Sequence, residues 1–191
     1  EICNHRGYFW PELYNEFYEI IRMRLKRSER KELSSLKNWL SLLEPRTIPE
    51  KFQMVVKSPP SPIWDFDQES KIMTKKIQKL ALECSRNPEE LMNNLSALFS
   101  GTNQYGHLLG YCIGQKLKNC DSFLNKSLEI LSDKKDERNL SLNVLGGFLT
   151  GVKSKNPEKA EEFRALIIKE KLLENQIFDL IVLSGTSPDD L

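Results

Sequence analysis

The stretch GYCIGQKLKN, residues 110–119, is matched at a spacing of 37 residues by GFLTGVKSKN, residues 147–156. Five of the ten aligned positions are identical, namely two glycines, two lysines and the final asparagine. A self-match at a spacing of this length is typical of proteins that repeat one small structural unit. The sequence therefore predicts a structural repeat in this part of the chain.

The ends of the matched stretches indicate the form of the repeated unit. Residues 156–158 read Asn-Pro-Glu, as do residues 87–89, and Asn119 stands at the equivalent place between them. The three asparagines recur at spacings of 32 and 37 residues. Because proline is favoured in the first turn of a helix, each unit is predicted to contain a helix, an Asn-Pro type of turn and a second helix.

Glycine pairs are the second feature of the repeat. Gly110 and Gly114 lie four residues apart in one predicted helix, and Gly147 and Gly151 do so in another. Glycines at this spacing share a helix face and allow a neighbouring backbone to approach closely. A membrane-embedded glycine contact is the competing interpretation, but Gln115 and two lysines follow at once and the apolar segment is too short. We therefore expect each pair to mark a packed contact between helices.

Helical patterns extend outward from the repeat. Apolar residues at three- and four-residue steps predict a helix over residues 67–86, behind a capping box formed by Asp65 and Gln68. Short links between the predicted helices favour antiparallel neighbours. The apolar stripe of this helix is Ile72, Met73, Ile77, Leu80, Ala81 and Cys84, and further helices are expected over 88–99, 104–118, 121–131, 137–152, 157–169 and 173–183.

Residues 1–66 have a different character. Helices are predicted over 11–27 and 33–44 as an antiparallel hairpin. Five prolines then surround Val55 and Val56 without a helical period, which predicts an ordered proline-rich connector over 45–66. The expected architecture is all-α: this N-terminal hairpin and connector, followed over 67–191 by antiparallel helix pairs stacked as an α-solenoid that is truncated at its C-terminal end.

With its leucine-rich helices, Asn-Pro turns and small residues at helix contacts, the chain resembles the helix-pair solenoids of the HEAT and armadillo class over about residues 71–191. The first part is similar to the entry into the helical sensor arms of large bacterial STAND-type defence NTPases. This second resemblance implies a role in antiphage defence and a nucleotide-binding module outside the chain, since the chain contains no G-x-x-x-x-G-K-[ST] motif. Its residues are Tyr14, the basic stretch 22–31 with Glu29 and Arg30, Leu33, Leu36, the segment 43–45 and the connector 58–65.

Composition narrows the classes of protein. The chain of 191 residues carries 28 Lys and Arg against 27 Asp and Glu, so its overall charge favours neither anionic nor cationic partners. The apolar run 177–183 is interrupted by Asp179 and is far shorter than the roughly 20 residues that cross a bilayer. Its four cysteines form no C-x-x-C pair, and no signal peptide is visible. A cytoplasmic location without membrane contact is expected.

Catalytic and metal-binding motifs are not recognisable. His5 and His107 have no partner at metal-ligand spacing, and no nucleophile motif such as G-x-S-x-G occurs. The carboxylate pairs at 89–90, 161–162 and 189–190 are assigned to first helical turns, where negative charge is favourable. We expect a protein that is not an enzyme and that binds no metal or cofactor.

Candidate interaction residues fall into a basic and an aromatic group. One basic run covers residues 22–31 and a second covers 71–79; solvated helix faces explain both, although such runs also bind phosphates. Two aromatic residues beside the prolines of the connector serve either as a recognition element or as an anchor to the core. The candidate surface comprises Arg22, Arg24, Lys26, Arg27, Trp64, Phe66, Lys75 and Lys76.

The expected function is that of a non-catalytic scaffold or sensor segment, which binds a protein partner or other domains of its parent chain. Glu1 in place of methionine, and a helix start at residues 188–190 that is cut off, favour a fragment of a larger protein. Two alternatives stay open. One is nucleic-acid binding through the two basic runs, and the other is a helical accessory domain of an enzyme whose active site lies outside the fragment.

Overall fold

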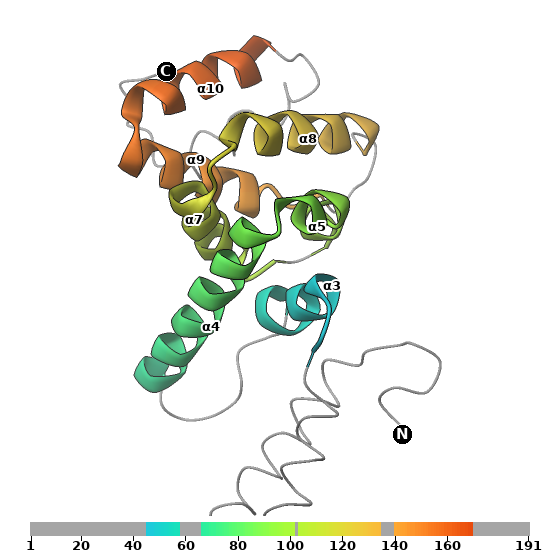
Figure 1. Ribbon diagram of the computed structural model, residues 1–191, viewed down its shortest axis with the longest axis vertical. Coiled ribbons are helices and arrows are strands. Elements are labelled where there is room, and N and C mark those ends of the chain that lie inside the picture. Colours follow the sequence, from blue (N-terminus) through green and yellow to red (C-terminus); the bar gives the residue numbers. More distant parts are fainter. Residues whose placement is uncertain (1–44, 58–65, 102, 135–139, 170–191) are drawn as a thin grey trace, which may run out of the picture.

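The computed structural model describes residues 45–57, 66–101, 103–134 and 140–169. Within these ranges the chain forms eight α-helices and one π-helical segment and no β-strand, which confirms the all-α class (Figure 1). The predicted helices over 11–27, 33–44 and 173–183 lie outside the described residues. The elements are α3 Ile48–Lys51, η1 Phe52–Lys57, α4 Phe66–Arg86, α5 Pro88–Asn93, α6 Ser96–Phe99, α7 Gly106–Lys116, α8 Cys120–Asp133, α9 Asn143–Lys155 and α10 Pro157–Lys169.

The proline-rich connector is helical over residues 48–57, contrary to the expectation that it lacks a helical period. Thr47 begins α3 with a capping box: the Glu50 N–H donates to Thr47 Oγ1, and the Glu50 carboxylate accepts from the Thr47 N–H at 3.1 Å. Pro49 lies in the first turn, where its missing N–H is not needed. The apolar residues of α3 and η1 return at helical steps and are buried, namely Ile48, Phe52, Val55 and Val56.

Helix α4 begins at Phe66 and ends at Arg86, as the periodicity predicts. Asp65, the expected cap, lies outside the described residues. Most of the predicted stripe is turned inward, with Ile77, Leu80, Ala81 and Cys84 buried and Met73 partly buried. Ile72 is the exception, because 43% of its surface is exposed.

The helix predicted over 88–99 is broken into α5 and α6. The side-chain amide of Asn94 donates to the Glu90 carbonyl at 2.8 Å and so occupies the acceptor that a continuous helix would use. The Asn94 backbone N–H turns instead to the Leu91 carbonyl at 3.1 Å. An asparagine side chain therefore competes with the helix at this point.

Helices α7, α8 and α10 agree with their predicted ranges within two residues, whereas α9 begins at Asn143 and not near residue 137. Leu140 forms an isolated antiparallel bridge with Ser100, and the Ser141 N–H donates to the Phe99 carbonyl at 2.9 Å. These backbone contacts hold residues 140–141 outside the helix, so that α9 starts later than its apolar pattern suggests.

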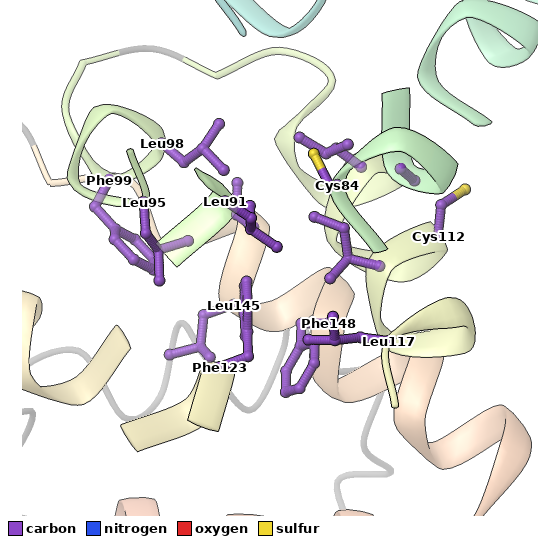
Figure 2. Close-up of a cluster of buried hydrophobic side chains, with 14 of the residues drawn as sticks. Cys84, Leu91, Leu95, Leu98, Phe99, Cys112, Leu117, Phe123, Leu145 and Phe148 are labelled. Atoms are coloured by element: carbon purple, nitrogen blue, oxygen red, sulfur yellow. The ribbon is translucent and has the colours of Figure 1, made fainter. Parts of the chain in front are cut away.

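One hydrophobic core joins the described helices. Figure 2 shows side chains from α4 to α9 converging on it. At its centre Phe148 of α9 lies between Phe123 of α8, at 4.3 Å between ring centroids, and Phe163 of α10, at 6.2 Å. The three rings therefore connect the last three described helices. None of the helices in the described ranges has the length and apolar composition that a bilayer crossing requires.

Candidate interaction surface

Helices α7 and α9 make the most extensive contact in the described part of the chain. Near the start of α7, Gly106 faces Asn143 at the start of α9. Near its end, Gly114 faces Val152. The two helices therefore run parallel. The short links predict that antiparallel chain neighbours make the main packing contact, and this prediction is wrong for α7 and α9.

The glycines bring these two backbones together. A Cβ atom at Gly110 would lie 2.8 Å from the Phe148 backbone nitrogen, and one at Gly147 would lie 2.7 Å from the His107 carbonyl carbon, closer than real Cβ atoms come. Gly151 is packed in the same way against the Tyr111 carbonyl. The expected role of the glycine pairs is confirmed: the two copies of the ten-residue match meet through their glycine faces.

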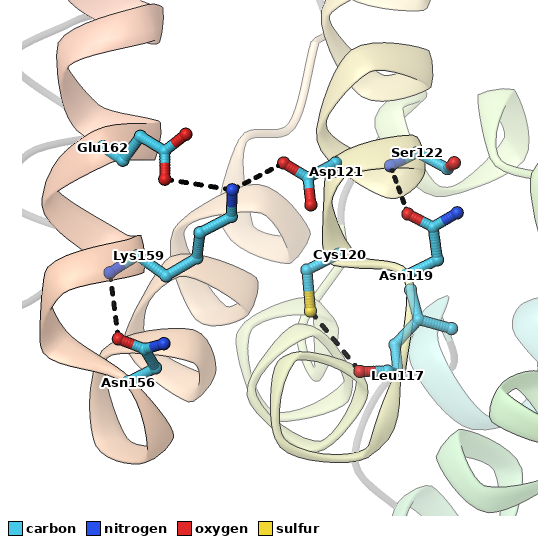
Figure 3. Close-up of polar contacts among 8 residues, drawn as sticks. All are labelled: Leu117, Asn119, Cys120, Asp121, Ser122, Asn156, Lys159 and Glu162. Atoms are coloured by element: carbon cyan, nitrogen blue, oxygen red, sulfur yellow. Dashed lines mark hydrogen bonds and ion pairs between the residues drawn. The ribbon is translucent and has the colours of Figure 1, made fainter.

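The second helices of the two copies begin with the same cap (Figure 3). Asn119 Oδ1 accepts from the Ser122 N–H at 3.1 Å, and Asn156 Oδ1 accepts from the Lys159 N–H at 3.0 Å. Asn87, the third asparagine of the pattern, makes no such side-chain bond at the start of α5. The capping geometry is therefore shared by the two later copies and not by the first.

Lys159 links the starts of α8 and α10. Its Nζ lies 2.7 Å from Asp121 Oδ1 and 3.0 Å from Glu162 Oε2. Hydrogen bonds to these carboxylates, that to Asp121 foremost, raise the pKa of Lys159 above its ordinary value. The same Nζ lies 4.8 Å from the centroid of the Phe163 ring. These contacts hold helices together and leave the ammonium group engaged within the chain.

The carboxylate pairs that the sequence assigns to first helical turns differ in their position. Glu89 and Glu90 lie in the first turn of α5, as predicted. The prediction is wrong for Glu161 and Glu162, because α10 starts at Pro157 and only Glu158 is acidic in its first turn. Glu161 instead pairs with Arg164 at 2.9 Å, and Glu162 pairs with Lys159, so both carboxylates make intrahelical ion pairs. The pair at 189–190 lies beyond the described ranges.

The described cysteines are buried or partly buried, with raised thiol pKa values. Burial, followed by the charges of Glu83 and Glu90, raises the pKa of Cys84 to about 12. Burial also raises the pKa of Cys112 and of Cys120. At neutral pH these thiols are protonated, and the thiolate is the reactive form. In residues 45–57, 66–101, 103–134 and 140–169, no three His, Cys, Asp or Glu side chains group in a way that could hold a metal ion.

The structure places part of the predicted surface. Lys75 and Lys76 are exposed on α4, together with Lys71 and Lys79. Phe66 opens α4, but its side chain lies outside the described part of the chain. Arg22, Arg24, Lys26, Arg27 and Trp64 also lie outside the described residues, so the first basic run is not part of the described surface.

A continuous stripe of α4 faces away from its buried side, and we call it the outer seam. Its residues follow one another at alternating steps of three and four, which places them on one helix face. A rotation of about 100° per residue puts this face opposite the buried Ile77, Leu80, Ala81 and Cys84. The outer seam consists of Ile72, Lys75, Lys79, Leu82 and Arg86, all exposed.

Three of these residues were not predicted as surface residues from the sequence, namely Ile72, Leu82 and Arg86. Their spacing could have found them, because Ile72, Lys79 and Arg86 follow one another at seven residues, as do Lys75 and Leu82, and a count of lysines alone ignores this. Within residues 70–86 of α4, acidic charge stands at one position only. The acidic residue of α4 after Ser70 is Glu83, which forms an ion pair with Lys51 of α3.

Compared with models of known protein families, with curated proteins and with solved structures, the chain shows no match. Its function is therefore inferred from its own residues.

Proposed function

We propose that this chain is a helical-repeat scaffold or sensor segment that binds a protein partner through its surface. The observation that carries the proposal is what the two copies of the repeat have in common, with α7 and α8 in the first copy and α9 and α10 in the second. The first helices of the two units pack in parallel through glycines, and the second helices begin with the same asparagine cap.

Repeated helix pairs that stack on one another share a core and leave a long outer surface. A long surface suits a macromolecular partner, because each unit adds a few contacts. Here the glycine contact is filled by backbone, and Lys159 is occupied by Asp121 and Glu162. Both features support assembly of the scaffold, which leaves partner recognition to exposed side chains.

The test is affinity capture from the native cells with the full chain as bait, followed by reconstitution with the purified candidate. We expect a partner that forms a complex of defined stoichiometry by light scattering, with cross-links on helices α4 to α10. A matched bait carries Gly110→Val, which should unfold the repeat and release the partner. Turnover of a small-molecule substrate by the purified chain, with no stoichiometric partner, would contradict the proposal.

Nucleic-acid binding is the second candidate, favoured by the exposed Lys71, Lys75 and Lys79 on one helix. Binding to a duplex oligonucleotide should then weaken steeply with salt, with a log-log slope close to the number of phosphates contacted. A flat salt dependence, or no binding at low salt, would exclude this candidate.

A further inference from the structure

We infer that the outer seam of α4 binds an acidic amphipathic helix of about four turns from a protein partner. This inference rests on the proposed function, since it names the surface and the chemistry of the partner. The seam runs from Ile72 to Arg86, and 14 residue steps at about 1.5 Å each give a length of about 21 Å.

The spacing of the seam favours a helix as the partner. Steps of three, four, three and four residues lead from Ile72 through Lys75, Lys79 and Leu82 to Arg86. This alternation is the pattern by which one helix packs along another, since it keeps the contacting side chains in a single row. A partner helix of the same length would meet all five side chains.

The charges of the seam favour an acidic partner. Lys75, Lys79 and Arg86 are exposed, and Glu83, the acidic residue within residues 70–86 of α4, is paired with Lys51 of α3. Asp or Glu side chains at the facing positions would find complementary charge, which speeds encounter and selects the partner.

Two exposed aliphatic residues distinguish a protein from a nucleic acid. Ile72 is 43% exposed and Leu82 is 38% exposed, and both lie in the same row as the cations. The charged phosphates of a nucleic acid would leave them in contact with water and anions, which gives no gain from burial. Leucine or isoleucine of a partner helix would remove their surface from water, and the aliphatic stems of the lysines would extend the apolar contact.

The experiment uses the full chain and a display library of helical 15-residue peptides in which the seam-facing positions are randomised. We expect enrichment of Asp and Glu opposite the cations and of apolar residues opposite Ile72 and Leu82. Affinity of the selected peptides is measured by fluorescence anisotropy. A photo-cross-linking amino acid at the exposed position Gln78, beside the seam, should capture them.

Charge reversal separates the seam from a general effect of charge. Lys75→Glu with Lys79→Glu should weaken a selected acidic peptide by about tenfold or more, because two attractions become repulsions. The matched control, Lys116→Glu with Lys118→Glu, changes two exposed lysines near the end of α7 and should alter the affinity by less than about twofold. A peptide with lysines in place of its acids should bind the first variant and not the parent chain.

Several results would overturn the inference. They are selection of peptides without the acidic pattern, equal binding by the charge-reversed and parent chains, cross-links outside α4, and failure to select any α4-binding peptide. Binding of a duplex oligonucleotide through Lys75 and Lys79, without peptide binding, would overturn it in favour of a nucleic acid. The scaffold proposal survives these results if the charge-reversed chain still captures a stoichiometric partner, so the two failures are distinguishable.

Discussion

The contact between α7 and α9 and the outer seam of α4 are opposite uses of a helix face. In the first, side chains are absent at Gly110 and Gly147, and backbone meets backbone. In the second, Lys75 and Leu82 are exposed on the face opposite the buried side of α4. The glycine contact therefore has no room for an added side-chain atom, whereas substitution of the exposed residues of the outer seam should leave the fold intact. Substitutions at the two faces should therefore differ in kind, from unfolding to unchanged stability.

The largest effect is expected at the glycine contact. Gly110→Ala with Gly147→Ala places Cβ atoms against backbone, which cannot move aside as a flexible side chain would. Alanine adds helix propensity of about 1 kcal/mol per site, but overpacking of about 1–3 kcal/mol or more per site should outweigh it. We expect the double variant to lose about 3 kcal/mol and to melt at a temperature lower by about 10 °C, as measured by circular dichroism.

Gly101→Ala serves as the control for this comparison. Gly101 has a φ of +73°, and no atom beyond its chain neighbours lies within 4 Å of the position that an added Cβ would take, so its replacement costs backbone strain of about 1 kcal/mol. If the double variant were no less stable than Gly101→Ala, the close approach of α7 and α9 would not be the origin of the effect.

The buried face of α4 should make stability depend on alkaline pH. Cys84 ionises near 9.0 in an ordinary environment and has a pKa of about 12 in the folded chain, so its protonated form stabilises the fold below pH 9 and this contribution is lost as pH rises towards 12. At about pH 10.5 the loss should be about 2 kcal/mol, as measured by urea unfolding.

Cys84→Ala isolates this contribution from the lysines that titrate in the same range. The variant should be less stable at neutral pH because of the cavity, but its stability should fall less steeply above pH 9. Parallel curves for the two chains would show that the thiol is not responsible.

A smaller effect is expected where the two second helices meet. Lys159→Met removes the ion pairs to Asp121 and Glu162 while keeping an aliphatic side chain beside Phe163. Because these pairs are largely exposed, the melting temperature should fall by about 2 °C or less, and less still in high salt. A large fall that persists in high salt would mean that packing against Phe163 dominates.

The smallest effect on stability belongs to the outer seam. Lys75→Glu with Lys79→Glu should change the free energy of unfolding by less than about 0.5 kcal/mol, because both side chains are exposed. Chemical denaturation of this variant beside the parent chain measures the change. Marked destabilisation would show that the seam belongs to the fold and would remove the contrast with the glycine contact.

The parts that the sequence predicts well are those in which local pattern and packing agree. The period of α4 and the Asn-Pro turn before α10 sufficed to predict the bounds of these helices, and the ten-residue match identified the glycine contact. The prediction failed where a local hydrogen bond decided the outcome. The Thr47 capping box allowed a helix among prolines, and Asn94 broke one that the apolar pattern continued.

The candidate surface was predicted in part, from Lys75 and Lys76. Ile72 was assigned to the core because an aliphatic residue next to a buried stripe looks like a member of it. Only the direction of the neighbouring helices decides which side of α4 is covered. The spacing of residues along α4 separates Ile72 from the face of Ile77 and Leu80, but it does not say which of the two faces the neighbouring helices cover.

The glycine contact also has a consequence for the continuity of the polypeptide. Helix α7 precedes the link between α8 and α9, and α9 follows it. Because α7 and α9 pack together, the parts of the chain on the two sides of this link are held by noncovalent contact as well as by the peptide bond. A protease site introduced between Lys134 and Leu140 should yield two pieces that remain associated after cleavage and that reassemble when expressed separately. The chain could then be used as a split reporter, in which the two pieces associate through the contact between α7 and α9.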